Sequence, residues 1–305
     1  MPLNDAMLER LEGWKTAATA LAPLLLGEEL SETPEELRAR YNRELARNRP
    51  PSGVSVSDVD MGGIGGALVT PDAPHDGRAM LYIHGGGYFS GGSAGYLGIA
   101  GHFAKRLGAR VYIPDYRLAP EHPFPAPLDD VVQAYAWLVA RAGSGKIVLA
   151  GDSAGGAMVV STMVRARNAG LALPAGGVAI SPWANLEMTG ASYTTRDGVD
   201  PLCTREVLML MARAALGHTR PNDPDVSPVF ADVRGLPPTL IQIGESEVML
   251  SDAIRLATHL ADSRVRTSLE VWPDMFHVWP MFVDVIPEAA EALQTASAFL
   301  DRAMR

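Results

Sequence analysis

The sequence has little of what disulfide-bonded or membrane-spanning proteins need. Its 305 residues include one cysteine, Cys203, so no internal disulfide can form, and we expect no metal site based on cysteine. We expect Cys203 to be a packed small residue rather than a nucleophile. The one candidate targeting stretch, Ala17–Leu26, is shorter than the about 20 apolar residues that cross a bilayer, and Pro23 interrupts it. Acidic residues precede it and no small-residue cleavage site follows, so we expect a cytoplasmic protein without a signal peptide.

Positive charge is also scarce. There are 26 Lys and Arg residues against 35 Asp and Glu, which gives a formal net charge of −9. This balance argues against nucleic acid or an anionic membrane as a partner. We therefore expect a small-molecule partner, with neither nucleic-acid binding nor membrane insertion. A homodimer stays open, because the apolar segment Leu208–Met211 can serve either internal packing or a contact between subunits.

From residue 78 onward, short β-rich runs alternate with longer helical patterns. Several runs are continuously apolar, as in strands that helices cover on both faces. This alternation predicts an α/β fold with a mostly parallel central sheet flanked by helices. Helical spacing of Leu293, Ala296, Leu300 and Met304 predicts a final amphipathic helix within 287–305. The expected strands are Ala79–His84, Arg110–Tyr116, Lys146–Ala150, Gly177–Ser181, Thr239–Gly244 and Thr267–Trp272.

Two segments lack this rhythm. In the first fifty residues, Thr33-Pro34-Glu35-Glu36 is a capping box with proline at the first helical position, and it predicts a helix to about Arg47. The second segment, at about 184–235, is rich in Met, Arg, Pro and Asp. We predict an N-terminal helical cap region over 1–50 and a catalytic domain over 51–305. A cap insertion at about 184–235 would cover the carboxyl edge of the sheet, where such folds bind ligands.

Residues 151–156 read Gly-Asp-Ser-Ala-Gly-Gly directly after an apolar run. A strand that enters G-x-S-x-G and is followed by helix-forming residues is typical of a nucleophile elbow, in which a sharp turn exposes the serine oxygen. Upstream, His84-Gly85-Gly86-Gly87 ends another expected strand. Consecutive glycines let backbone N–H groups approach a reacting oxygen closely. The pattern predicts Ser153 as nucleophile, with the N–H groups of Gly86, Gly87 and Ala154 as an oxyanion hole.

A serine nucleophile needs a base and a group that orients the base. The chain order Ser–acid–His leaves His259 and His277, and we favour His277 because it follows the strand Thr267–Trp272 after a short loop. The acid is less defined. After the strand Thr239–Gly244, Glu247 is placed to reach back to the histidine, while Asp252 and Glu245 remain candidates.

These motifs resemble the hormone-sensitive-lipase family of esterases within the α/β-hydrolase fold. The resemblance rests on HGGG, GDSAGG and the segment 115–127 (DYRLAPEHPFPAP), and it covers roughly residues 50–300. It implies a carboxylesterase without metal or cofactor, an N-terminal cap, and Ser153, His277, Gly86, Gly87 and Ala154 in the roles given above. The family commonly has Asp-Pro-Leu where this chain has Glu247-Val248-Met249, which changes the type of acid. The motifs around Pro182 and Pro273 look like those of a bacterial branch of esterases and ε-lactone hydrolases.

We therefore expect a serine carboxylesterase that hydrolyses short-to-medium acyl esters through an acyl-enzyme, with Ser153, His277 and Glu247 as triad. A lactone hydrolase with the same triad is the alternative, and a non-catalytic receptor on the same fold is a second one. Arg117 and Glu121 are expected to pair and hold the 116–127 segment. His84, Asp152 and Asp252 are expected to support the site. The residues that flank the motifs as candidate pocket lining are Tyr88, Tyr96, Trp183, Val278 and Trp279.

Overall fold

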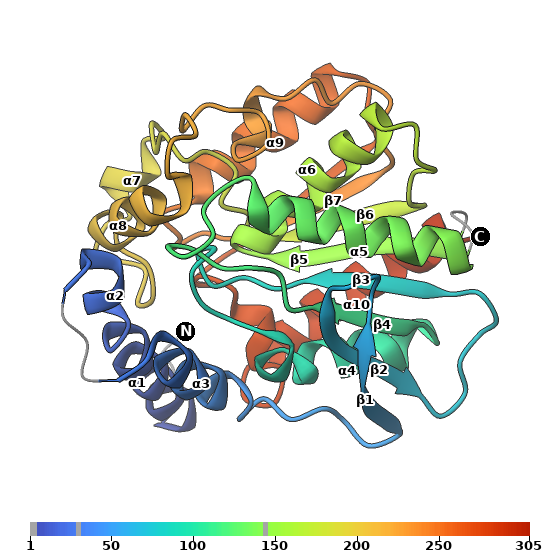
Figure 1. The fold of residues 1–305 in the computed structure, drawn as a ribbon, viewed down its shortest axis with the longest axis horizontal. Coiled ribbons are helices and arrows are strands. Elements are labelled where there is room, and N and C mark those ends of the chain that lie inside the picture. The colour runs from blue at the N-terminus through green and yellow to red at the C-terminus, as the bar shows by residue number, and fades with distance from the viewer. Residues whose placement is uncertain (1–4, 29–31, 143–145) are drawn as a thin grey trace.

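A twisted eight-stranded sheet forms the centre of the computed structural model, which describes residues 5–28, 32–142 and 146–305 (Figure 1). The spatial order is β1-β2-β4-β3-β5-β6-β7-β8, and all pairs from β4 to β8 are parallel. The mostly parallel sheet predicted from the sequence is therefore confirmed. The strands are β1 Val54–Asp60, β2 Gly65–Pro71, β3 Ala79–Ile83, β4 Arg110–Pro114, β5 Ile147–Asp152, β6 Gly176–Ile180, β7 Thr239–Gly244 and β8 Thr267–Trp272.

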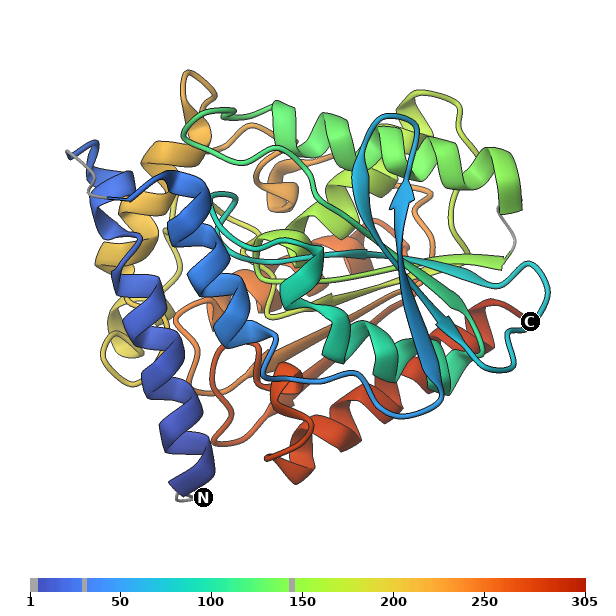
Figure 2. The ribbon, with the colours of Figure 1, turned by 60° about the horizontal axis from the view of Figure 1, so that its bottom comes forward.

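Helices cover both faces of the sheet, as Figure 2 shows: α5 and α6 lie on one face, and α4 and α10 on the other. Every residue of β3, β5, β6 and β7 is buried, which explains why these strands read as continuous apolar runs. The longer helices are α1 Asp5–Thr19, α3 Pro34–Leu45, α4 Leu97–Leu107, α5 Ala126–Ala142, α6 Ala154–Asn168, α8 Arg205–Leu216, α9 Leu250–Asp262 and α10 Pro287–Ala303. Two short ones are α2 Ala22–Leu26 and α7 Ser192–Thr195.

The sequence did not predict the hairpin β1–β2, which extends the sheet antiparallel to β4. Every residue of β1 is at least partly exposed. Because such a strand does not need a continuous apolar run, its sequence gives no buried-strand signal. The side chain of Asp60 accepts the N–H groups of Gly62 and Gly63, at 3.0 and 2.9 Å, and so holds the turn. This hairpin lies at the opposite edge of the sheet from β8, away from the motifs.

The N-terminal segment folds as α1, α2 and α3, and α1 packs on α3. The predicted capping box is present: Thr33 Oγ1 accepts the N–H of Glu36, and Glu36 accepts the N–H of Thr33. Trp14 contacts both Tyr41 and Phe282, with ring centroids 6.3 and 5.5 Å apart. The apolar stretch 17–26 is thus part of this packing, with Leu21 fully buried. Within the described ranges, no helix is both long and apolar enough to cross a bilayer.

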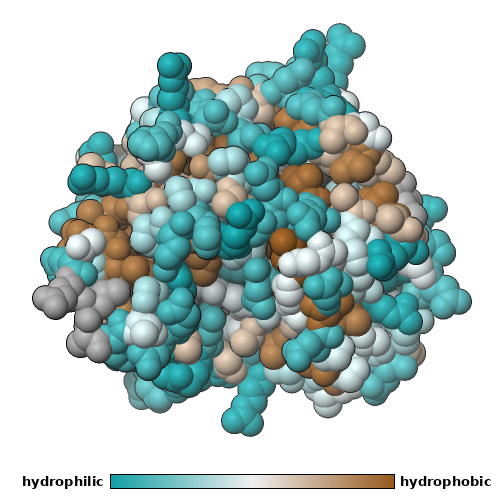
Figure 3. Space-filling view, in the orientation of Figure 1, coloured by the Kyte–Doolittle hydropathy of each residue, from teal (hydrophilic) through white to brown (hydrophobic). Residues whose placement is uncertain are grey.

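The 184–235 segment contributes α7, α8 and the 3-10 turn Pro228–Phe230 between β6 and β7. Its helix α8 contacts α2, so the two segments without βα rhythm meet beside the sheet (Figure 1). Apolar side chains gather on the surface over α2 and α8 (Figure 3). Leu26, Val207 and Met209 are the large apolar residues of these two helices that are exposed.

Arg38 on α3 ties the N-terminal helices to the rest of the chain. Its guanidinium donates to the backbone oxygens of Phe89 and Ala119, both at 2.8 Å, and pairs with Glu121 at 2.7 Å. The expected Arg117–Glu121 pair is therefore wrong. Helix α5 instead brings Asp130 to Arg117, at 2.7 Å. The 116–127 segment is still held through both residues, Glu121 by Arg38 on α3 and Arg117 by Asp130 on α5.

We expect Arg38→Ala to loosen the N-terminal helices, because hydrogen bonds from a charged group contribute about 1.5–3 kcal/mol each. Proteolysis should cut residues 1–50 faster than in the native chain, as followed by mass spectrometry. Arg40→Ala is the matched control, since Arg40 lies on the same helix and pairs with the exposed Glu32. Equal cleavage rates in the two variants would contradict this role of Arg38.

Candidate active site

Ser153 lies in the turn between β5 and α6, at the carboxyl edge of the sheet. Its backbone has φ 54° and ψ −120°, a conformation that L-residues rarely adopt. Hydrogen bonds hold this turn on both sides: the Ser153 N–H donates to Ile180 O at 2.9 Å, and Ser153 O accepts the N–H of Trp183 at 3.0 Å. This is the geometry of a nucleophile elbow, and it leaves the side chain at the pocket surface.

Glycine is required both after the nucleophile and in the loop that follows β3. A Cβ on Gly155 would lie 2.0 Å from the backbone oxygen of Ile83, so the start of α6 can approach β3 only without a side chain. Gly86 has φ +103°, and a Cβ there would lie 2.2 Å from Ser90 O. The two glycine motifs of the sequence thus bring the loop after β3 and the start of α6 together.

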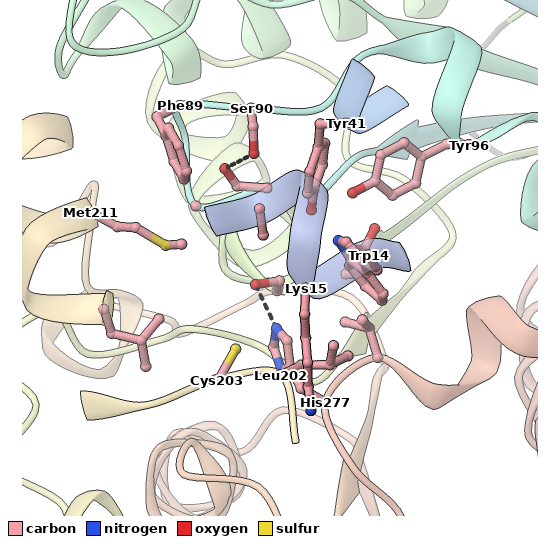
Figure 4. A pocket seen from close by; sticks show the side chains of 17 residues that line it. Trp14, Lys15, Tyr41, Phe89, Ser90, Tyr96, Leu202, Cys203, Met211 and His277 are labelled. Carbon is pink, nitrogen blue, oxygen red and sulfur yellow. Dashed lines mark hydrogen bonds between the residues drawn. The ribbon is translucent and has the colours of Figure 1, made fainter. Parts of the chain in front are cut away.

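His277 and Glu247 complete a hydrogen-bonded chain with Ser153, of which Figure 4 shows the contact between His277 and the serine. The distance from His277 Nε2 to Ser153 Oγ is 2.9 Å, and from His277 Nδ1 to Glu247 Oε2 it is 2.8 Å. All three side chains are buried, with Glu247 fully so. Burial lowers the pKa of His277, but contacts with Cys203 and Glu247 outweigh it and raise this pKa well above its usual value.

Ser181 is a positioning residue that the sequence did not single out for a role. It follows β6, and its hydroxyl donates to Glu247 Oε1 at 2.7 Å while accepting the N–H of Val278 at 3.0 Å. Glu247 Oε1 also accepts the N–H of Gly244, at 2.6 Å. These bonds fix the carboxylate and the histidine loop relative to each other. In the sequence, the signal for a role of Ser181 was its place at the carboxyl end of a central strand.

The other candidate acids and the other candidate base have different partners. Asp252 accepts the hydroxyl of Tyr193 at 2.6 Å, so it supports the α7–α9 packing instead of contacting His277. Glu245 forms an ion pair with Arg196. His259 lies on α9, and its Nε2 is 2.7 Å from Ala231 O. Of the three candidate acids Glu247, Asp252 and Glu245, only Glu247 is within hydrogen-bond distance of His277.

Asp252 is expected to affect stability rather than chemistry. Burial raises its pKa to about 7, above the about 3.9 of an unfolded chain. Between these values the folded state holds the extra proton, so the free energy of unfolding falls as pH rises from about 4 to 7. In Asp252→Asn we expect the free energy of unfolding to fall less between pH 5 and 8 than in the native chain. The difference should be on the order of 3 kcal/mol, measured by urea unfolding. Asp262→Asn, at the exposed end of α9, is the control, and an unchanged pH slope in Asp252→Asn would contradict this expectation.

His84 and Asp152 support the glycine loop, residues 85–87, through contacts with Gly85. The His84 ring stacks on Tyr116 with centroids 4.1 Å apart, and its Nδ1 lies 2.8 Å from Gly85 O. Burial lowers the pKa of His84 to about 4, which keeps the ring neutral. Asp152 accepts the N–H of Gly85 at 3.1 Å and the hydroxyl of Tyr82 at 2.9 Å, and burial raises its pKa to about 7. Among the described residues, neither side chain forms a hydrogen bond with Ser153 Oγ, whose partner is His277.

A largely apolar pocket of about 620 Å³, counted with its opening to solvent, lies over Ser153 and His277. Phe89 and Met211 line one side, and Trp14 and Tyr96 the other (Figure 4). Of the five candidate lining residues, Tyr96 and Val278 line it. Tyr88, Trp183 and Trp279 do not, because each packs in the interior against another aromatic ring: Phe124 and Trp183 around Tyr88, and Trp272 beside Trp279.

The sequence missed the contribution of distant segments to this pocket. Trp14, Lys15 and Tyr41 reach it from the N-terminal helices, and Leu208 and Met211 from α8. Cys203 also lines it, beside His277, so it is buried as expected but at the site and not in a remote core. Within the described residues, one set of side chains could hold a metal ion: Asp200, Cys203 and His277.

Several known proteins are similar to this chain in sequence and in fold. Residues 80–281 match a family described as having the alpha/beta hydrolase fold. The chain is 41% identical to an acetyl-hydrolase of Streptomyces hygroscopicus over 81% of this chain and 83% of that protein. It is 29% identical to an esterase of Acinetobacter venetianus over 94% and 96%. The crystal structure of an esterase from the bacterial hormone-sensitive lipase family superposes with a TM-score of 0.91 at 36% identity, covering both chains fully.

Proposed function

Because the chain belongs to the bacterial hormone-sensitive-lipase family of α/β hydrolases, we propose that Ser153, His277 and Glu247 catalyse the hydrolysis of carboxylic esters with short acyl groups. The chain is a carboxylic ester hydrolase, as its relatives are. The single observation that carries the assignment of residues is the continuous hydrogen-bonded chain from Ser153 Oγ through His277 to Glu247. A receptor on the same fold has no need of this arrangement.

The geometry supports a two-step reaction. His277 Nε2 takes the Ser153 proton while Oγ forms a bond to the ester carbonyl carbon, and the carbonyl oxygen becomes an oxyanion. The N–H groups of Gly86, Gly87 and Ala154 stabilise this oxyanion; Ala154 begins α6, so its N–H has no partner within the helix. The carbon–alkoxy bond then breaks, and the alcohol leaves with the proton from His277. Water repeats the sequence and releases the acid.

The pocket supports a short acyl group. Large side chains from three separate segments, among them Trp14, Phe89 and Met211, lie close around the nucleophile. A similar chain is named an acetyl-hydrolase. In this proposal, residues 1–50 and the insertion at about 184–235 together form a cap that encloses the acyl group and excludes water. We also propose a cytoplasmic enzyme acting on small soluble esters.

The test is the chain-length dependence of kcat/KM for p-nitrophenyl esters from acetate to dodecanoate. We expect the maximum at acetate to butyrate and a fall of at least about tenfold by octanoate, because atoms that do not fit displace side chains. ε-Caprolactone, measured in parallel, tests the lactone alternative. Met211→Ala should shift the maximum to longer chains, whereas Met209→Ala, exposed on the same helix, should not. A maximum at dodecanoate in the native chain would contradict the short-acyl proposal.

A further inference from the structure

Three potential metal ligands meet at the edge of the active site. Asp200 and Cys203 come from the turn just before α8, and His277 comes from the loop after β8. A carboxylate oxygen of Asp200, the Cys203 sulfur and a ring nitrogen of His277 all lie within 4.8 Å of one another. All three residues are buried or nearly so. The catalytic sequence described above uses only the histidine.

Asp200 has an unsatisfied oxygen in this cluster. The residue is 3% exposed, and its Oδ1 accepts the N–H groups of Leu202 at 2.9 Å and Cys203 at 3.3 Å. Its Oδ2 has no hydrogen-bond partner among the residues that the structure describes. Buried carboxylate oxygens are normally paired, since burying them unpaired is costly. A cation in the cluster would supply the missing partner.

The donor set fits one class of cation. A thiolate, an imidazole and a carboxylate are the ligands of Zn²⁺, at about 2.3, 2.0 and 2.1 Å, and a fourth tetrahedral position is left for water or Ser153 Oγ. The hydrogen bond from His277 Nδ1 to Glu247 is also the arrangement that orients metal-binding histidines. Hard Mg²⁺ prefers oxygen ligands and does not suit a thiolate.

We propose that Asp200, Cys203 and His277 form an inhibitory site for Zn²⁺. The ion bonds to the lone pair of His277 Nε2, which otherwise accepts the Ser153 hydroxyl, and the Cys203 thiol loses its proton to solvent. No residue changes oxidation state, and Ser153 keeps its proton. The inhibitory effect rests on the proposed function, because it requires His277 to be the base, whereas the binding itself does not.

Binding is tested first, with Co²⁺ as a spectroscopic probe in the metal-free protein. We expect thiolate-to-cobalt charge-transfer absorption that saturates with one ion per chain and that Zn²⁺ abolishes by competition. Since Cys203 is the single cysteine of the sequence, this absorption can arise from no other residue. It should vanish in Cys203→Ala and weaken in Asp200→Asn. Absence of the charge-transfer band in the native protein would overturn the site.

Inhibition is tested by Zn²⁺ titration of p-nitrophenyl acetate hydrolysis, each variant being compared with its own rate in EDTA. We expect the Zn²⁺ concentration for half inhibition to rise at least about tenfold in Cys203→Ala and in Asp200→Asn. In the control Leu202→Ala, which changes a neighbouring pocket residue outside the cluster, it should stay near the native value. Mg²⁺ should not inhibit. Half inhibition at the same Zn²⁺ concentration in Cys203→Ala as in the native protein would overturn the proposal.

The two sets of results separate the site from the proposed function. If no ester is hydrolysed, the proposed function fails while the Co²⁺ titration still decides whether the ion binds. If esters are hydrolysed and the cobalt band appears without Zn²⁺ inhibition, the inhibitory proposal is wrong. Circular dichroism of each variant shows whether a change in binding arises from unfolding.

Discussion

Ser153→Ala is expected to lower kcat for p-nitrophenyl butyrate at least about 10⁴-fold, because the hydroxyl is the atom that forms the acyl-enzyme. Binding should persist, since the pocket walls and the oxyanion donors are unchanged. Alanine removes the hydroxyl and its 2.9 Å hydrogen bond to His277 Nε2, but it leaves the main chain of the strained elbow in place. The variant should therefore fold as the native chain does. Stopped-flow measurement in the native enzyme should also show a burst of p-nitrophenol wherever deacylation limits the rate.

Ser161→Ala is the matched control for this loss. Ser161 lies on α6, the helix that begins directly after Ser153; it is buried, and its hydroxyl has no hydrogen-bond partner among the described residues. Its removal should leave ester hydrolysis near the native rate. If Ser153→Ala keeps more than about 1% of the native kcat after repurification, the acyl-enzyme mechanism through Ser153 is wrong.

Glu247→Gln is expected to cause the second largest effect, a fall in kcat of roughly 10³–10⁴-fold. The substitution keeps the shape and can keep the hydrogen bonds from Ser181 and Gly244, but it removes the charge beside His277 Nδ1. Without that charge, the imidazolium formed during attack loses its stabilisation in a fully buried site. KM should change much less than kcat, because Glu247 does not line the pocket.

Two variants test whether the acid is assigned correctly. Glu245→Gln is the same chemical change two residues upstream, in a residue that pairs with Arg196. Asp252→Asn alters a carboxyl bonded to Tyr193. Neither should reduce kcat comparably to Glu247→Gln. If either of them does, while Glu247→Gln stays active, Glu247 is not the acid of the triad.

Much of the site follows from short-range patterns. The elbow at 151–156 and the glycines at 84–87 occupy single turns whose geometry depends on nearby backbone, so residue type and order suffice to predict them. His277 follows in the same way from its place after a strand. The strand predictions were accurate within about two residues at each end, and for β3, β5, β6 and β7 the reason is the simple apolar signature of buried parallel strands. The β1–β2 hairpin, mostly exposed, has no such signature.

The choice among Glu247, Asp252 and Glu245 needed the fold. The three lie within eight residues of chain, and the sequence alone does not show which carboxylate points toward His277. The turn after β7 directs Glu247 toward His277, while α9 carries Asp252 to Tyr193. Ion pairs behave similarly: Arg117 and Glu121 lie close in sequence but take partners from α5 and α3. Side-chain direction after a turn is a property of packing.

The sequence by itself determined the α/β-hydrolase fold and the places of the serine motif, the glycine loop and the histidine after β8, because these depend on local backbone conformation and strand order. Tertiary structure alone decided which acid meets the base, and it placed Trp14, Tyr41 and Met211 around the nucleophile. It also brought Asp200 and Cys203 beside His277, across more than seventy residues of chain. The physical reason is that such contacts depend on how whole helices pack, and packing adds many weak, non-local interactions that no short segment encodes.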